Sequence, residues 1–209
     1  MYSYSIVFVL LMWEVGCVRQ DVRCPDVRPT ELDLVELDGE WYLAAVATDM
    51  NITGECAFMV FNHKNMNTTD VSISWITNNT ASYYNGSVAL TVGRNGGDLL
   101  LVTYIDKKTE TYSVLAVDYE HYAVIFACYD DPSGNGSTYE LWKLTRAPHL
   151  KRTDAVQLDR AVANYSLQNT SFMFFNNSER SCKLNGGYLN QASLVLTSAT
   201  ALALFRRLY

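Results

Sequence analysis

The residues that could carry chemistry are few and widely spaced. His63, His121 and His149 are isolated and lack the His-x-x-x-His or similar spacing that would bring metal ligands together. The acidic pair Asp130-Asp131 lies in a polar turn, where solvated carboxylates are ordinary. These residues therefore predict neither a metal centre nor an acid–base pair, and the histidines are expected at the surface.

The cysteines suit crosslinking better than catalysis. An apolar run, Ile6 to Trp13, is too short to span a bilayer and precedes small residues at Val15-Gly16-Cys17, which predicts a secretory signal peptide over residues 1–17. Cleavage there leaves four cysteines: Cys24, Cys56, Cys128 and Cys182. An even number in a secreted chain predicts two disulfides, with three pairings open. Such a framework leaves no thiol nucleophile, and we expect no enzymatic activity.

Eight Asn-x-Ser/Thr sequons point to the same extracellular compartment. Most lie beside turn residues, which favours a glycosylated surface. They are Asn51, Asn67, Asn78, Asn85, Asn135, Asn164, Asn169 and Asn176.

The chain has 209 residues and a formal charge of −6, which argues against a general nucleic-acid binder. One domain is expected over residues 18–184.

Short strand patterns separated by turns fill most of this domain. The expected strands are residues 41–50, 56–63, 71–76, 82–92, 99–105, 112–117, 122–128 and 137–145. Since no helix interrupts them, parallel pairing is disfavoured. We predict an all-β fold in which eight antiparallel strands close into an up-and-down barrel, with an interior that holds at most one small ligand.

One amphipathic helix follows the expected barrel. Apolar side chains recur at helical spacing from Ala155 to Val162, and Thr153 or Asp154 could cap the first turn. The helix is expected to pack outside the barrel, followed by a short strand over residues 171–175.

The C-terminal tail changes composition. Small residues, Asn185-Gly186-Gly187, precede an apolar stretch over residues 192–205. This order predicts a glycosylphosphatidylinositol (GPI) attachment signal over residues 185–209, with Asn185 as the attachment residue. The alternative is a frayed apolar tail on a soluble protein.

Three motifs in order resemble the signatures of the lipocalin family. Gly39-Glu40-Trp41 resembles Gly-x-Trp, Val117-Asp118-Tyr119 resembles Thr-Asp-Tyr with Val117 at the first position, and Arg146 resembles the third signature. Residues 116–128 look like the apolipoprotein D and Lazarillo branch. The resemblance covers about Cys24 to Cys182.

The resemblance carries structural expectations. It implies the disulfides Cys24–Cys128 and Cys56–Cys182. It also places Arg146 across the closed end of the barrel from Trp41, where a guanidinium over an indole makes a cation–π contact. Gly39, Trp41, Asp118, Tyr119 and Arg146 are then structural residues.

The ligand would occupy the barrel interior. Tyr112 and Trp142 match positions that contact ligand in apolipoprotein D-like pockets, and Trp142 shares a face with Arg146, four residues away. Strand parity adds six further expected lining residues: Leu43, Ala45, Val114, Ala116, Val124 and Phe126. With no inward Lys or Arg evident as a carboxylate anchor, a neutral ligand is favoured.

The function expected is transport of a small hydrophobic ligand (a fatty acid, retinoid, sterol or bilin) by a secreted or membrane-anchored protein. It needs no cofactor. The first alternative is a cell-surface glycoprotein that acts through protein or cell-surface partners, as in Lazarillo. The second is a lipocalin with a pocket thiol or haem.

Overall fold

The computed structural model describes residues 18–20, 23–65, 68–93, 96–132, 134, 136–184 and 187–188. The predicted signal peptide, the attachment residue Asn185 and the sequons Asn67 and Asn135 lie outside the described residues. In the described part of the chain, no helix is long and apolar enough to cross a membrane.

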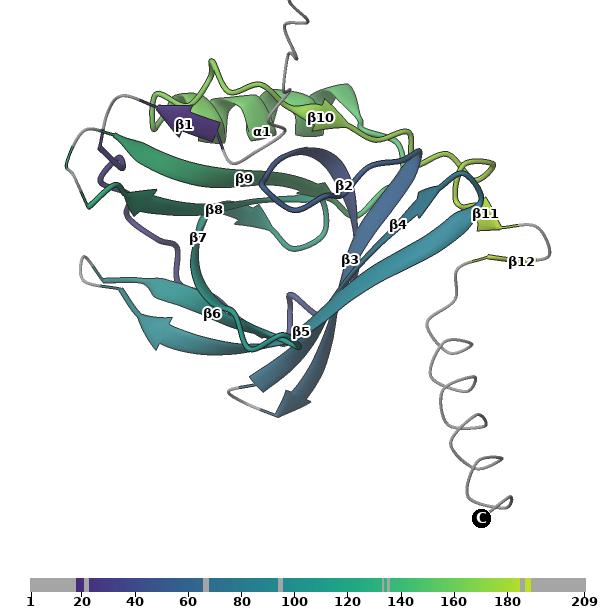
Figure 1. Ribbon diagram of the computed structural model, residues 1–209, viewed down its shortest axis with the longest axis horizontal. Helices are drawn as coiled ribbons and strands as arrows, with labels where there is room; N and C mark the ends of the chain where they lie inside the picture. Colours follow the sequence, from purple (N-terminus) through teal and green to yellow (C-terminus); the bar gives the residue numbers. More distant parts are fainter. Residues whose placement is uncertain are drawn as a thin grey trace, which may run out of the picture.

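Eight antiparallel strands form a closed barrel, as the sequence predicts (Figure 1). Each strand pairs with the next, and the last pairs with the first to close the barrel. The strands are β2 (Gly39–Ala47), β3 (Cys56–Asn65), β4 (Thr68–Thr77), β5 (Thr80–Val92), β6 (Asp98–Tyr104), β7 (Thr109–Asp118), β8 (Tyr122–Asp130) and β9 (Ser137–Thr145).

Short turns set the register of this sheet. Between β4 and β5, Thr77 opposes Thr80 across a two-residue turn. Its central residues, Asn78 and Asn79, have φ of 49° and 63°. Asparagine tolerates positive φ, which two-residue hairpin turns need to match strand twist. This turn thus fixes the register between β4 and β5, and with it which face of these two strands points inward.

Two of the four remaining short strands extend the barrel sheet. β1 (Val18–Gln20) pairs with β9, and β10 (Met173–Phe174) pairs with β2. The latter confirms the strand expected near residues 171–175. β11 (Lys183–Leu184) and β12 (Gly187–Tyr188) pair only with each other.

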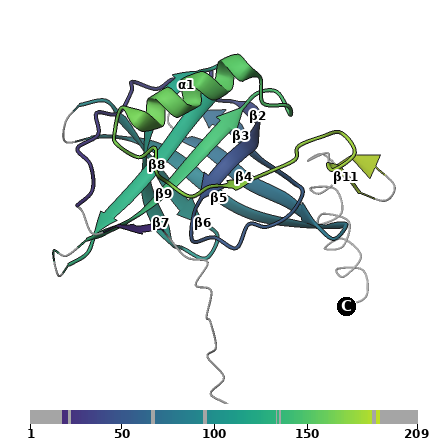
Figure 2. The same ribbon diagram turned by 90° about the horizontal axis from the view of Figure 1, so that it is seen from above.

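The helix α1 (Arg152–Ala163) packs on the outside of the barrel, along β7 and β8 (Figure 2). Leu158, Ala161 and Val162 are buried there. The expected capping is wrong: Lys151 is the N-cap, it makes no side-chain capping bond, and Thr153 and Asp154 lie within the first turn. The helix is therefore held by packing rather than by a cap.

Two disulfides tie the flanking segments to the barrel. Cys24–Cys128 joins the N-terminal segment to β8, and Cys56–Cys182 joins the segment after the helix to β3. This is the pairing that the family resemblance implies. The bridges span 104 and 126 residues, so each stabilises the fold by about 4–5 kcal/mol in the chain-entropy model.

Candidate functional site

The closed end of the barrel is built around Trp41 and Arg146. Trp41 is fully buried, its indole Nε1 donates to the Leu37 carbonyl at 2.8 Å, and the Arg146 guanidinium lies 3.8 Å from the ring centroid. The expected cation–π contact is thus present. Gly39 has φ of +95°, and a Cβ there would lie 3.2 Å from Arg146 Nη1. Glycine therefore allows both the turn and the close approach of the guanidinium.

Backbone carbonyls accept the hydrogen bonds of the Arg146 guanidinium. Its guanidinium donates to the carbonyls of Glu36, Asp38, Glu40 and Tyr119 at 2.8–3.2 Å. These carbonyls belong to the N-terminal segment, the start of β2 and the turn after β7, so one side chain joins three parts of the chain.

The turn after β7 is also held by its own side chains. The Asp118 carboxylate accepts a hydrogen bond from the Glu120 amide, and the Tyr119 hydroxyl accepts one from the Asp33 amide. The five residues expected to be structural therefore meet around the closed end.

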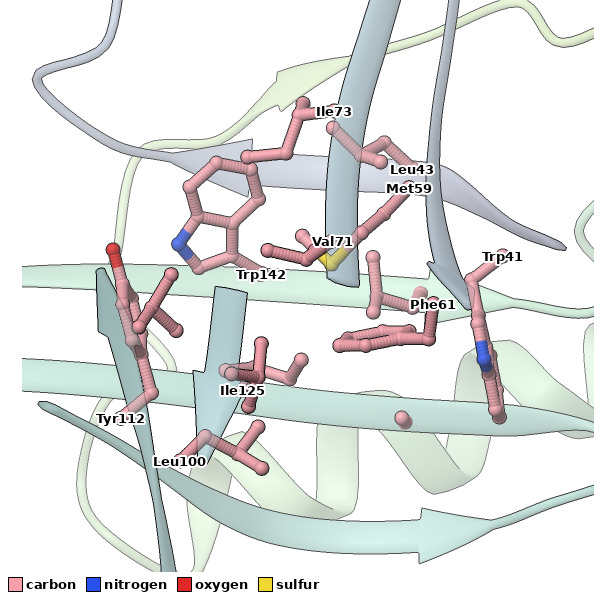
Figure 3. Packing of buried hydrophobic residues seen from close by; sticks show 14 of the residues in the cluster. Trp41, Leu43, Met59, Phe61, Val71, Ile73, Leu100, Tyr112, Ile125 and Trp142 are labelled. Atoms are coloured by element: carbon pink, nitrogen blue, oxygen red, sulfur yellow. The ribbon is translucent and has the colours of Figure 1, made fainter. Parts of the chain in front are cut away.

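An apolar cavity lies inside the barrel, away from Trp41 (Figure 3). The space between its lining atoms is about 340 Å³, including the part open to solvent. The lining side chains come from six strands and are Met59, Phe61, Val71, Ile73, Leu100, Val102, Tyr104, Tyr112, Ile125 and Trp142. Tyr112 and Trp142 face the cavity as expected.

Two β-bulges make part of the lining prediction wrong. The pairing shifts register between Leu43 and Ala45 on β2, and between Val114 and Ala116 on β7. An extra residue reverses the inward parity beyond it. Ala45 consequently opposes Lys143, whose side chain lies outside the barrel, and Ala116 packs in the cluster beneath α1.

Leu43 and Val114, which precede the bulges, do face inward. Both belong to the inner core but do not border the cavity.

The prediction for β8 is also wrong. Ile125 opposes the inward Trp142, so its neighbours Val124 and Phe126 point outward and pack beneath α1. Apolar periodicity could not distinguish these faces, because one faces the barrel core and the other faces the helix.

A buried acidic cluster lies at the open end of the cavity. Glu110 and Glu140 are 6 % and 2 % exposed. The Tyr112 hydroxyl lies 2.5 Å from Glu110 Oε2 and 2.9 Å from Glu140 Oε2. Trp142 Nε1 donates to Glu140 Oε2 at 3.2 Å, and the Thr48 hydroxyl donates to Oε1 at 2.8 Å.

Sequence reasoning missed both glutamates, although a signal was present. Glu110 precedes Tyr112 by two residues, and Glu140 precedes Trp142 by two. Residues two apart share a face of a strand, so predicting Tyr112 and Trp142 inward should have placed both carboxylates inward as well.

Burial perturbs the ionisation of this cluster. The pKa of Glu140 is raised to about 7, first by desolvation and then by a hydrogen bond with Asp49. Desolvation likewise raises the pKa of the Tyr112 hydroxyl, with the nearby Glu140 charge adding to it. Lys108 Nζ lies 2.6 Å from Glu110 Oε1, and this contact raises the pKa of the ammonium. The cluster is thus acidic and contains one cationic side chain, Lys108.

The sequon asparagines and the possible metal ligands are the remaining sites considered from the sequence. Five of the described sequon asparagines are exposed, and Asn85 is half-buried. The exposed ones are Asn51, Asn78, Asn164, Asn169 and Asn176. Across the described residues, no group of three His, Cys, Asp or Glu side chains could hold a metal ion.

Known proteins share this architecture. Residues 38–179 match the Lipocalin / cytosolic fatty-acid binding protein family. Insecticyanin-A from Manduca sexta is 22 % identical over 174 residues, which cover 79 % of this chain and 92 % of that protein.

Solved structures agree. Insecticyanin from the same species superimposes with a TM-score of 0.67 at 21 % identity, covering 81 % of this chain and 94 % of that one. H1 crustacyanin from the lobster Homarus americanus gives 0.64 at 15 % identity, covering 78 % and 92 %. These structures establish the fold, and because the family match spans most of the barrel, the chain belongs to the Lipocalin / cytosolic fatty-acid binding protein family.

Proposed function

We propose that this protein is an extracellular carrier that binds one small, largely apolar ligand in the barrel cavity. The observation that carries this proposal is a cavity lined by apolar and aromatic side chains inside a barrel that Trp41 and Arg146 close at one end. Burial of apolar ligand surface there contributes roughly 25 cal/mol per Å². A retinoid, sterol, fatty acid or bilin has the small, largely apolar body that this lining suits.

Titration with the neutral fluorophore N-phenyl-1-naphthylamine tests the proposal. We expect saturable fluorescence enhancement at one site per chain, reversed by competing apolar ligands. Val102→Phe should abolish it by filling the cavity, because Val102 lines this space. Thr103→Phe is the matched control, since Thr103 is the next residue on β6 and is exposed. The proposal fails if the fluorophore does not bind, or if both variants bind like the wild type.

The extracellular part of the proposal is supported by the two disulfides and the exposed sequons. Treatment with an N-glycosidase should lower the apparent mass of protein from secreting cells.

Attachment to the membrane through a GPI anchor on Asn185 is a separate element of the proposal. Phosphatidylinositol-specific phospholipase C should then release the protein from cells, and full recovery in the medium without the enzyme would contradict attachment.

The same exposed sequons support the alternative, a cell-surface glycoprotein that acts through partners. Val102→Phe again separates the two functions. A cellular activity that survives loss of fluorophore binding would favour the partner-based role.

A further inference from the structure

We propose that the ligand of this cavity carries a protonated amine, held at the open end by Glu110 and Glu140. The inference rests on the proposed carrier function and names the ligand class for that site. The sequence favoured a neutral ligand because no inward Lys or Arg was evident. The two inward carboxylates, Glu110 and Glu140, reverse that expectation.

The acidic cluster borders the cavity through two lining side chains, Tyr112 and Trp142; Glu110 and Glu140 lie directly behind them. Tyr104, Tyr112 and Trp142 line the apolar space, and Tyr112 and Trp142 also hydrogen-bond to the carboxylates. A molecule that packs its apolar part against these rings therefore brings its head group next to Glu140. Figure 3 shows Tyr112 and Trp142 side by side, with Trp41 at the far side of the core.

Three contacts meet at the Tyr112 oxygen, but Tyr104 and Tyr112 carry only two hydroxyl protons. Tyr112 carries one hydroxyl proton but lies within hydrogen-bond distance of both Glu110 and Glu140. Tyr104, 3.0 Å from the Tyr112 oxygen, can supply a proton only to that oxygen. One tyrosine cannot donate to two carboxylates, so one of these two contacts needs a further proton. The other contacts have donors already, since Glu140 accepts from Thr48 and Trp142 and Glu110 pairs with Lys108. In the empty cavity Glu140 can hold that proton itself, in keeping with its raised pKa. An ammonium group would supply up to three donors and a compensating charge.

The charge of the cluster selects against anions. Glu110 and Glu140 are buried, whereas the one ammonium, Lys108, is half exposed and already paired with Glu110. Asp49 adds a further acidic group beside Glu140. A ligand carboxylate would enter next to buried carboxylates of like charge, which is unfavourable. Fatty acids and retinoic acid are therefore expected to bind poorly.

Three ligands of matched shape test the inference: 2-phenylethylamine, 2-phenylethanol and phenylacetate. Each competes with N-phenyl-1-naphthylamine on purified protein at pH 8. We expect the amine to bind at least about ten-fold more tightly than the alcohol, as for a charge-assisted hydrogen bond in a buried site. Phenylacetate is expected to bind more weakly than the alcohol.

Two charge-removing variants identify the residues responsible. Glu140→Gln and Glu110→Gln should each reduce amine affinity about ten-fold and leave alcohol affinity within about two-fold. Glu55→Gln is the control, since Glu55 is exposed at the same end of the barrel. Circular dichroism shows whether each variant folds. If one glutamine variant does not fold, the other is enough for the test.

The outcomes separate the two proposals. If the fluorophore binds but the amine binds no better than the alcohol, the amine inference is overturned and the carrier function stands. Preserved amine selectivity in both glutamine variants also overturns it. If the fluorophore itself does not bind, the carrier function fails, and the inference fails with it.

Discussion

The two ends of the barrel place opposite charges beside a tryptophan, a half-buried Arg146 at one end and a buried Glu140 at the other, and they satisfy those charges differently. At the closed end, Arg146 covers Trp41 and donates to four backbone carbonyls. At the open end, Glu140 accepts from Trp142 while sharing the single proton of Tyr112 with Glu110. The closed end has a donor for every one of these contacts, whereas the contacts of Tyr112 at the open end need one further proton.

This difference predicts different consequences of mutation. Backbone carbonyls do not titrate, so the closed end should contribute stability that does not vary with pH between about 5 and 8. The open end contains a carboxyl group with a perturbed pKa, so its contribution should change over that range.

Trp41→Ala should have the largest effect on stability. It removes a fully buried indole, together with its hydrogen bond to the Leu37 carbonyl. We expect a loss of about 3–5 kcal/mol in the free energy of unfolding, as for other large-to-small core substitutions. Urea unfolding measures the loss. Trp75→Ala is the control, because Trp75 is only partly buried and should cost less. Equal losses would show that the closed end has no special role.

Arg146→Met should be next in size. Methionine retains some packing on Trp41 but leaves the carbonyls of Glu36, Asp38, Glu40 and Tyr119 without their donor. Hydrogen bonds from a charged donor contribute about 1.5–3 kcal/mol each, but three of these bonds are exposed and the one to Tyr119 is part-buried, so water can replace the donor at most of the carbonyls; we expect a total loss of about 2–4 kcal/mol. The loss should be the same at pH 5 and pH 8. A loss present at only one pH would contradict this account of the closed end.

Glu140→Gln should instead produce an effect that depends on pH. The pKa of Glu140 is raised from 4.5 to about 7, so the folded state binds more protons than the unfolded state between these values. The stability of the wild type therefore falls as pH rises through this window, by up to about 3 kcal/mol. Glutamine remains neutral, so the variant should match the wild type near pH 5 and be about 2–3 kcal/mol more stable at pH 8.

Urea unfolding at the two pH values measures this effect. Glu55→Gln, at an exposed position, should leave the pH dependence unchanged. A Glu140→Gln variant that is destabilised equally at both pH values would mean that Glu140 acts as an ionised acceptor throughout.

The sequence predicts the closed end better than the open end for a physical reason. Trp41, Arg146 and the Asp118-Tyr119 turn are held together by a few specific contacts that need those residue types. The motif therefore appears in the sequence itself. The eight strands are equally predictable from the sequence, since alternating apolar residues mark each strand and turn residues mark its ends.

The lining of the cavity depends on information that residue types do not carry. The bulges at Ala44 and Leu115 reverse parity without a glycine or proline to mark them. Both faces of β8 are apolar, because the barrel core lies on one side and α1 on the other. Glu110 and Glu140, by contrast, could have been predicted inward from their two-residue spacing to Tyr112 and Trp142.

Tyr104→Phe should have the smallest effect, and it tests the proton count at the open end. The variant loses the hydroxyl contact with Tyr112 but retains the ring, whose centroid lies 4.7 Å from that of Tyr84. If Tyr104 donates to the Tyr112 oxygen, the loss should be about 1 kcal/mol, the net value of one neutral hydrogen bond. Tyr84→Phe is the matched control, because its hydroxyl bonds to the exposed Asp106 and should leave the urea midpoint unchanged. A Tyr104→Phe variant as stable as the wild type would mean that this hydroxyl contributes no net hydrogen bond. The proton deficit would then be confined to the two glutamates and Tyr112, where an ammonium ligand is proposed to bind.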